Sequence, residues 1–434
     1  MKPRVLIVMT TPYSTSDSSR TLDAYFHFWS RDKVAQIFTR NWIPSKGHCE
    51  QLYQITDERL LKKWFNPNFI VGKLYHYEDL ENQKGNNVID TNSIINIGYK
   101  IGSLHSPFIE LFRRMLWKKN KWCTEQLNSW LDDYKPEVIV WNFSNHLFTQ
   151  PIVMYIADRY NIPVVAIIGD DYYFGNKNKL SISSKIYNKM FKKYTEKILL
   201  DHCSSAVYCS DKIKELYNNY FKMNGETVYF TSEIKRRRFR AINKSHPKIV
   251  YFGSIRLGRN NSLISLANTL GKIDESYKLE VYSNELDEHL YKPLKENENV
   301  YYGGSIPYEE VVNKINDCDI YVIVEGFEKE NIELTKYSLS TKAADGLASG
   351  ASILTYGPSD CGVISYLDST NASVVCTNPS DLQKKIEQLL EDQDLQRLIY
   401  ENAVKATKAN HTLEKSTKTF ENVVEKVLEK KERV

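Results

Sequence analysis

Short apolar runs alternate with helix-like segments along this whole chain, and the alternation starts afresh at residue 248. The clearest runs lie at 4–9, 137–141, 163–168, 206–210, 227–231, 248–253, 279–282, 320–324, 352–356 and 373–377. Strands separated by helices favour parallel sheets with helices on both faces. The pattern therefore predicts an α/β protein with two doubly wound, Rossmann-like domains.

A basic segment that ends in Pro247 separates the two series, and it begins with KRRRFR at residues 235–240. Such a stretch between two strand–helix series is typical of a linker. We expect an N-terminal domain over residues 1–240, a second domain over 247–411 and an amphipathic terminal helix over 412–434. Residues 44–105 are irregular and rich in asparagine, and the pattern places no element in them.

Composition excludes several classes of protein. Of the 434 residues 26% are charged and 42% are hydrophobic, so the chain is neither disordered nor fibrous. No run approaches 18 apolar residues, which argues against a membrane-spanning helix, and the first apolar run is too short for a signal-peptide core. The seven cysteines form no Cys-x-x-Cys pair, so we expect a reducing cytoplasm and no structural metal.

The charge is unevenly distributed. Residues 1–246 carry 36 Lys and Arg against 24 Asp and Glu, whereas residues 247–434 carry 22 against 30. The basic half includes two helix-like patches, at 113–121 and 185–197, that are typical of a surface facing anionic lipid; a solvated helix face is the alternative. Because the richest motif lies in the acidic half, we expect no nucleic-acid partner.

That motif is the stretch 337–350, YSLSTKAADGLASG. Ser340 and Thr341 open a helix that ends at Gly350, and the free N–H groups and dipole of a helix N-terminus favour an anion. Lys342 adds positive charge, and Asp345 lies one turn further along, where an acid can accept hydrogen bonds from sugar hydroxyls of a nucleotide. The alternative is an ordinary capped helix with a surface lysine and aspartate.

The stretch 337–358, YSLSTKAADGLASGASILTYGP, resembles the donor-binding signature of retaining GT-B glycosyltransferases (the family 4-like group 1 enzymes), in a subgroup with an STK turn followed by LASG. The similarity extends to YFGSIRLGRNNSLISLA from residue 251, VYYGGSIPYEEV from 300 and DIYVIVEGF from 319. It covers 247–430 well, 135–232 loosely and 10–130 hardly at all. The resemblance implies two Rossmann-like domains that face a cleft, with a C-terminal helix, and sugar transfer with retention of configuration and without a metal.

The resemblance also implies roles for single residues. The family's Glu-x7-Glu motif ends in a ribose-binding glutamate, whose position is held here by Asp345. The motif's first glutamate, which contacts the donor sugar, is replaced by Tyr337, and Glu325 at the preceding strand end is the candidate substitute. Arg259 lies near the family's phosphate-binding lysine, and Arg256 is a weaker match to its arginine partner. For these two arginines the alternative is a solvated loop.

Three further positions follow from the same resemblance. Gly253 begins the phosphate-binding loop, and Ile306 belongs to the loop whose backbone reads the nucleotide base. His146 follows a strand where the family often places a histidine that reaches the donor sugar; a structural histidine is the alternative. Asp317-Cys318-Asp319 has the form of a metal-binding DxD, but its place between a helix and a strand indicates a structural role.

Fixed cations and helix N–H groups can stabilise the charge of a departing nucleoside diphosphate without a metal. We therefore expect an enzyme that moves a hexose or deoxyhexose from a nucleotide diphosphate sugar to a glycan or lipid-linked glycan, as in the synthesis of a cell-surface polysaccharide. The sugar nucleotide is the donor substrate and no other cofactor is expected. We expect a cytoplasmic protein, with the inner face of the plasma membrane as an open location. Two alternatives remain: a non-catalytic subunit that binds a glycan or a partner, and a nucleotide-sugar epimerase.

Overall fold

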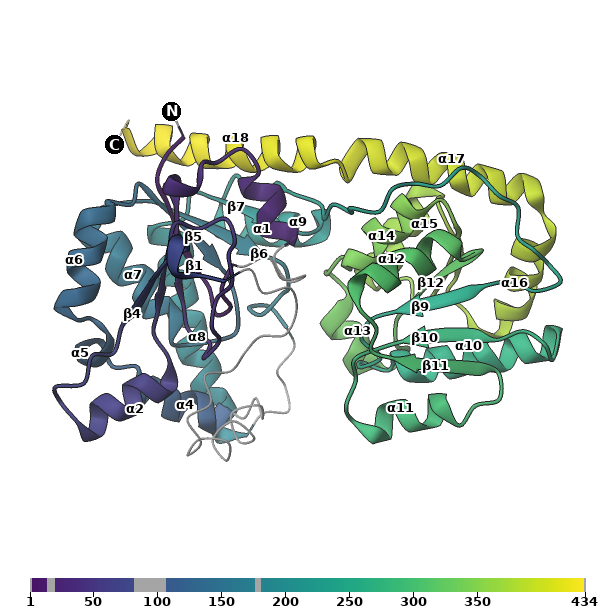
Figure 1. Ribbon diagram of the computed structural model, residues 1–434, viewed down its shortest axis with the longest axis horizontal. Coiled ribbons are helices and arrows are strands. Elements are labelled where there is room, and N and C mark those ends of the chain that lie inside the picture. Colours follow the sequence, from purple (N-terminus) through teal and green to yellow (C-terminus); the bar gives the residue numbers. More distant parts are fainter. Residues whose placement is uncertain (1, 14–19, 82–106, 176–180, 433–434) are drawn as a thin grey trace. The chain divides into compact units, whose positions relative to one another are not determined.

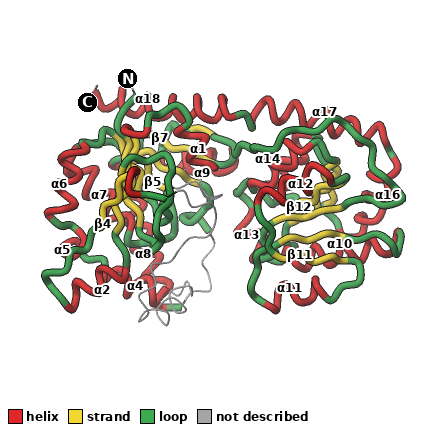
Figure 2. The backbone as a smooth tube through the Cα atoms, viewed as in Figure 1, coloured by secondary structure: helices red, strands yellow, loops and turns green. Residues whose placement is uncertain are grey.

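The computed structural model describes residues 2–13, 20–81, 107–175 and 181–432, and the chain divides into two units (Figure 1). The first unit comprises Met1–Val228 together with Thr417–Val434, and the second comprises Tyr229–Ser416. In each unit the strands form one sheet with helices around it (Figure 2). The prediction of two doubly wound α/β domains is confirmed.

Among the described residues the first unit holds an eight-stranded sheet with the order β4-β3-β2-β1-β5-β6-β7-β8. Neighbouring strands are parallel except β3 and β4. The strands are β1 Val5–Val8, β2 Val34–Phe38, β3 Gln51–Gln54, β4 Lys73–His76, β5 Val138–Asn142, β6 Val164–Ile168, β7 Ser205–Tyr208 and β8 Glu226–Thr227. The central strands are buried along their whole length, as the apolar runs predict for a parallel sheet covered on both faces.

The helices of this unit are α1 Arg20–Phe26, α2 Asp57–Phe65, α4 Pro107–Leu116, α5 Lys119–Trp122, α6 Glu125–Tyr134, α7 Thr149–Tyr160, α8 Ile182–Asp201 and α9 Asp211–Phe221. The expected terminal helix is α18, Leu413–Glu432, and from Thr417 onward it packs on this unit rather than standing apart. The ring of Phe420 stacks on Tyr25 with 4.8 Å between centroids, and Thr417 Oγ1 donates to the carbonyl of Ala24 over 2.6 Å.

The second unit is built on a parallel sheet with the order β11-β10-β9-β12-β13-β14 in the part of the chain that is described. Its strands are β9 Ile249–Phe252, β10 Leu279–Tyr282, β11 Val300–Gly304, β12 Ile320–Val324, β13 Ser352–Tyr356 and β14 Val374–Cys376. Its helices are α10 Arg259–Ile273, α11 Glu288–Lys295, α12 Tyr308–Asp317, α13 Lys329–Thr335, α14 Thr341–Ser349, α15 Gly362–Thr370, α16 Leu382–Glu391 and α17 Gln393–Asn410.

Side chains of these strands alternate between two hydrophobic clusters. Ile249 and Val322 point into a cluster with Leu263 of α10 and Ile386 of α16. The neighbouring strand residues, Tyr321 among them, join a second cluster that includes residues of α12, α14, α15 and α17. Because successive strand residues face opposite sides, this alternation buries both faces of the sheet.

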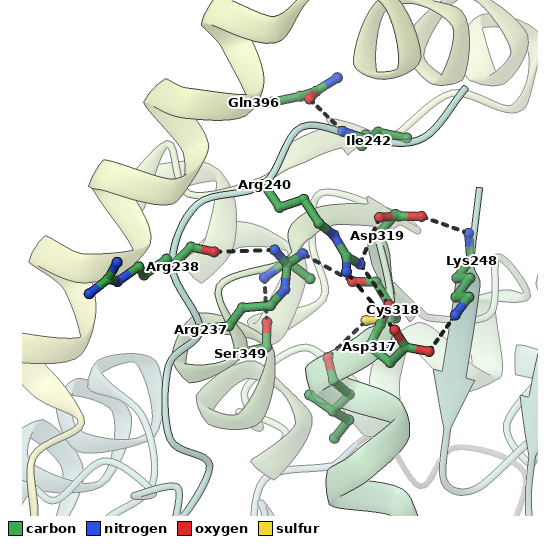
Figure 3. A network of polar contacts seen from close by, with 12 residues as sticks. Arg237, Arg238, Arg240, Ile242, Lys248, Asp317, Cys318, Asp319, Ser349 and Gln396 are labelled. Atoms are coloured by element: carbon green, nitrogen blue, oxygen red, sulfur yellow. Dashed lines mark hydrogen bonds and ion pairs between the residues drawn. The ribbon is translucent and has the colours of Figure 1, made fainter. Parts of the chain in front are cut away.

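The basic segment at 235–240 is not a free linker, because its arginines are bonded to the second unit (Figure 3). Arg237 Nη2 donates to the carbonyl of Cys318 over 3.0 Å, and Arg240 Nη2 donates to Asp319 Oδ1 over 2.9 Å. The neighbouring Asp317 pairs with the ammonium of Lys248. The structural role expected for Asp317-Cys318-Asp319 is confirmed, since both carboxylates hold the entering chain to the sheet.

Helices and strands also lie in a region where no pattern predicts them. Of the region 44–105, residues 51–76 contain β3, α2 and β4, while 82–106 lie outside the described residues. Gly303 and Gly304 form the end of β11. No helix within the described ranges is long and apolar enough to cross a membrane.

Candidate active site

Three loops meet at the carboxyl edge of the second sheet. β9 is followed by Gly253, and β12, which pairs with β9, is followed by Glu325. β13, on the other side of β12, is followed by Gly357. The strand order changes direction between β9 and β12, and in open parallel sheets ligands bind outside the strand ends at such a point.

Arg259 and Glu325 form a buried, bidentate ion pair at this edge. Arg259 is the first residue of α10; its Nε donates to Glu325 Oε2 over 2.9 Å and its Nη2 donates to Oε1 over 3.0 Å. The side chains are 13% and 4% exposed. Burial tends to lower the pKa of Arg259, but the carboxylate outweighs it and the pKa is raised. Both oxygens of Glu325 are therefore occupied by one guanidinium.

Glu325 is also fixed through its backbone. Its N–H donates to the carbonyl of Tyr356 on β13 over 3.0 Å, and its carbonyl accepts from Ser262 Oγ of α10 over 2.7 Å. The glutamate therefore ties α10 to two strands, and the structure gives it the geometry of a residue that orients Arg259.

Lys342 lies next to this pair, at the second position of α14. Its Nζ donates to the hydroxyl of Tyr251 over 2.7 Å and lies 4.6 Å from the centre of that ring. Burial of the ammonium, and then the positive charge of Arg259, lower the pKa of Lys342 to about 7, while Glu325 acts in the opposite direction. An ammonium with this pKa is close to losing its proton at neutral pH, and an added anion would restore it.

Gly253 makes room for Lys342. Its φ is +112°, and a Cβ added to it would lie 2.6 Å from Cε of Lys342. A side chain at this position would strain the backbone and displace the lysine. The expected role of Gly253 in the loop thus has a steric reason.

The start of α14 has the predicted form. Ser340 is the N-cap residue, and its Oγ accepts from the N–H of Lys342 over 3.3 Å, while Thr341 is exposed. One turn later Asp345 is buried, and its Oδ1 accepts from Ser232 Oγ over 2.7 Å. The carboxylate therefore starts from a bonded position, so any contact with a ribose hydroxyl must share it with Ser232 or displace the serine.

Arg256 pairs with a residue that sequence reasoning missed. Its Nε and Nη2 each donate to Glu285 over 2.7 Å, and Glu285 Oε1 also accepts from the N–H groups of Leu286 and Asp287. The pKa of Glu285 is lowered, chiefly by the hydrogen bond from Arg256. The available signal was position, because Glu285 follows β10 at the same edge of the sheet.

The remaining two predicted residues lie elsewhere. Ile306 follows β11 and packs, half-buried, on the cluster that contains Phe252. His146 belongs to the first unit, after β5, where it is buried and its Nδ1 lies 3.4 Å from Glu110 Oε1. Arg113 Nη1 also donates to Glu110, over 3.0 Å, and the lowered pKa of Glu110 results from these partners overcoming its burial. In this network His146 has the surroundings of a structural residue.

Comparison with known proteins shows which family and which solved structures the chain resembles. Residues 261–422 match the family model described as "Glycosyl transferase-like". No curated protein matches the chain. A crystal structure of HepE from Anabaena in complex with UDP is 11% identical, with a TM-score of 0.58 over 98% of this chain and 100% of that one.

Two further solved structures are similar. The α,α-trehalose-phosphate synthase (UDP-forming) of Burkholderia xenovorans, in complex with glucose-6-phosphate, is 8% identical with a TM-score of 0.59, over 98% of this chain and 100% of that one. TarM is 15% identical with a TM-score of 0.49, over 66% of this chain; the chain covers only 54% of TarM. At these identities the likenesses describe the fold alone.

The two doubly wound units have the GT-B fold, and residues 261–422 resemble a glycosyltransferase-like family. The matched region includes most of the second unit, so the similarity to glycosyltransferases lies chiefly in that unit.

Proposed function

We propose that this enzyme transfers a hexose or deoxyhexose from a nucleotide diphosphate sugar to a glycan acceptor, and that the second unit binds the donor. The observation that carries the proposal is the cationic cluster of Lys342 and Arg259, each at the start of a helix that begins at the carboxyl edge of the sheet. Two guanidinium or ammonium groups and two helix N-termini suit a diphosphate. That HepE has been crystallised with UDP supports the same ligand class here.

Each residue then has a role. Lys342 and the N-terminus of α14 bind the diphosphate, and Arg259, held in place by Glu325, stabilises the charge that develops on it. Asp345 is assigned to the ribose and the loop at Ile306 to the base. Glu325 is assigned an orienting role rather than a contact with the sugar, because Arg259 occupies both of its oxygens.

In the proposed reaction, the bond between the anomeric carbon and the diphosphate oxygen breaks, and its electron pair leaves with the nucleoside diphosphate. The acceptor hydroxyl oxygen forms the new bond to that carbon and releases its proton, which neutralises one negative charge on the leaving group. Loss of one preorganised cation typically costs about 10²–10³ in rate. We propose that no metal is needed and that the configuration is retained; unchanged turnover in EDTA and the anomeric coupling of the product in NMR spectra test these two points.

The first experiment is thermal unfolding against nucleotides and nucleotide sugars, with donor hydrolysis measured in the same samples. A ligand at about 100 times its Kd adds about 2.7 kcal/mol of stability. We expect stabilisation by one nucleoside diphosphate and its sugar, lost in Lys342→Ala and kept in Lys272→Ala, an exposed lysine at the far end of α10. Absence of any shift would favour the non-catalytic binding subunit, and conversion of the donor sugar to an isomer without transfer would favour an epimerase.

The acceptor and the location complete the proposal. We propose a lipid-linked glycan precursor of a surface polysaccharide as acceptor and a place at the inner face of the plasma membrane, supported by the basic composition of the first 246 residues.

A further inference from the structure

Large apolar side chains are exposed on three helices of the first unit. They are Leu61, Trp64 and Phe65 of α2, Phe112 and Met115 of α4, and Ile182 and Ile186 of α8, with exposed fractions from 37% to 80%. Leu61 lies three residues before Trp64 and four before Phe65, Phe112 lies three before Met115, and Ile182 lies four before Ile186, so the members of each set share one side of their helix. Contiguous exposed apolar area of this kind marks an interaction site more often than a plain solvated face.

The three helices are neighbours, and α5 lies beside them. α2 contacts α4 and α5, and α4 contacts α8; Figure 1 shows α2 and α4 together at one end of the first unit. Arg113 of α4 pairs with Asp57 of α2 over 2.6 Å, and the guanidinium of Arg114 lies 4.5 Å from the ring of Tyr194 on α8. Lys121 of α5 lies 5.6 Å from the ring of Trp64. The exposed apolar groups therefore belong to one continuous surface.

The charge of this surface is strongly positive. The four helices and Lys118 contain thirteen Lys and Arg against five Asp and Glu. On α8 four lysines recur every fourth residue and are exposed: Lys185, Lys189, Lys193 and Lys197. This stripe runs beside Ile182 and Ile186.

Most of the acidic residues of these helices already have partners. Asp57 is paired with Arg113, and Glu58 with Lys62 over 2.8 Å. Glu110 is buried beside His146, and Glu196 accepts a hydrogen bond from Tyr173. The fifth, Asp201, ends α8 at the opposite end from Ile182. The lysines of α8 therefore meet little opposing charge on their own surface, whereas Lys62 of α2 is paired with Glu58.

We propose that this aromatic–lysine face, formed by α2, α4, α5 and α8, docks on an anionic lipid bilayer, with the apolar side chains entering the headgroup region and the lysines contacting lipid phosphates. Aromatic and aliphatic groups flanked by lysines suit a membrane interface, where one side of the surface is apolar and the charges meet anionic headgroups. A nucleic acid would complement the lysines but leave Phe65 and Ile182 in water. The inference deepens the peripheral location proposed above, but it does not depend on the donor site.

Co-sedimentation of the full chain with vesicles tests the proposal. We expect binding to phosphatidylglycerol vesicles that weakens with salt, and at least tenfold weaker binding to phosphatidylcholine vesicles. Trp64→Ser with Phe65→Ser, and separately Lys185→Glu with Lys189→Glu and Lys193→Glu, should each weaken binding at least tenfold. Leu286→Ser with Lys272→Glu, which alters exposed residues of the second unit, should bind like the wild type.

Two readouts make the outcome decisive. Unfolding curves of each variant must match the wild type, and each must keep its stabilisation by nucleotide, whereas Lys342→Ala should lose that stabilisation and still bind vesicles. Equal binding to both lipids, or unchanged binding in both face variants, would overturn the proposal. Loss of self-association in Trp64→Ser with Phe65→Ser, without any vesicle binding by the wild type, would show instead that the face joins two copies of this chain.

Discussion

Two bidentate arginine–glutamate pairs lie at the same edge of the second sheet, and they differ in burial. In the first pair Arg259 and Glu325 are 13% and 4% exposed; in the second, Arg256 is 62% exposed while Glu285 is 5% exposed. The hydrogen-bond geometry is nearly the same. Burial of the arginine therefore separates the two pairs, because loss of Glu325 leaves the Arg259 guanidinium desolvated, whereas Arg256 stays in water without its glutamate.

The two glutamates also differ in the other hydrogen bonds that their carboxylates accept. Glu325 has no hydrogen bond to its carboxylate among the described residues other than those from Arg259, whereas Glu285 is also held by two backbone N–H groups. Arg256 can thus leave Glu285 for an arriving phosphate at little cost, while Arg259 stays where Glu325 holds it. We infer that the first pair is a fixed part of the site and the second is exchangeable.

The largest effect is expected from Glu325→Ala. The substitution leaves the Arg259 guanidinium buried and unpaired, which typically costs 3–5 kcal/mol, so the free energy of unfolding in urea should fall by about that much. The same variant should also lose stabilisation by nucleotide, because Arg259 is no longer oriented.

The double variant Glu325→Leu with Arg259→Met is the control for that prediction. It removes both charges together, so it should be more stable than Glu325→Ala, and the difference measures the coupling of the pair. A loss below 1 kcal/mol in Glu325→Ala would contradict the comparison, because the two pairs would then be energetically alike.

The second prediction is that the stability of the protein depends on pH through Lys342. Its pKa is lowered from 10.5 to about 7 in the folded chain, so between these values the unfolded chain binds more protons and stability rises with pH. The stability that Lys342 contributes is complete above about pH 10.5 and is lost as the pH falls through about 7. The slope of the free energy of unfolding against pH is at most about 1.4 kcal/mol per pH unit. Unfolding curves measured from pH 7 to 9 should show this slope in the wild type and not in Lys342→Met.

Ligand affinity should depend on pH in the opposite direction to stability, through the same group. A bound diphosphate raises the pKa of Lys342, so binding takes up a proton and affinity falls as pH rises above about 7. Isothermal titration with UDP in buffers of different ionisation enthalpy measures that proton directly. Proton uptake that persists in Lys342→Met would assign it to another group.

The second unit could be predicted closely from the sequence for a physical reason. β12, β13 and α14 have the expected limits because the strands are continuous buried runs and α14 ends at Gly350, whose φ is +82°. β3 was missed because its sequence, QLYQ, hides a buried strand: Gln54 is buried and its Nε2 donates to the carbonyls of Arg40 and Trp42. Buried polar residues whose hydrogen-bond partners are distant in the sequence give no apolar pattern.

The candidate site, too, contains some residues that could be predicted from the sequence and others that could not. Lys342 was found because a helix N-terminus with a cation has a local sequence signature, and Arg259 was found because its position lies near that of the family's phosphate-binding lysine. Two partners of the site's cations were not found. Tyr251, which binds Lys342, reads as a plain strand residue, and Glu285 lies 29 positions from Arg256, which it binds. The arginines at 235–240 were misjudged for the same reason, since their partners lie about 80 residues or more away.

The smallest effect on stability is expected from Arg256→Ala. The pair is exposed on the arginine side, so its loss should change the free energy of unfolding by less than about 1 kcal/mol. Affinity for UDP should nevertheless fall about tenfold, because a charge-assisted hydrogen bond to phosphate is worth about 1.5 kcal/mol or more. Glu285→Gln is the matched control, since it weakens the hold on Arg256 but keeps the guanidinium, and it should bind UDP at least as well as the wild type. If Arg256→Ala instead destabilised the chain as much as Glu325→Ala, Arg256 would be part of the fixed scaffold and not an exchangeable phosphate contact.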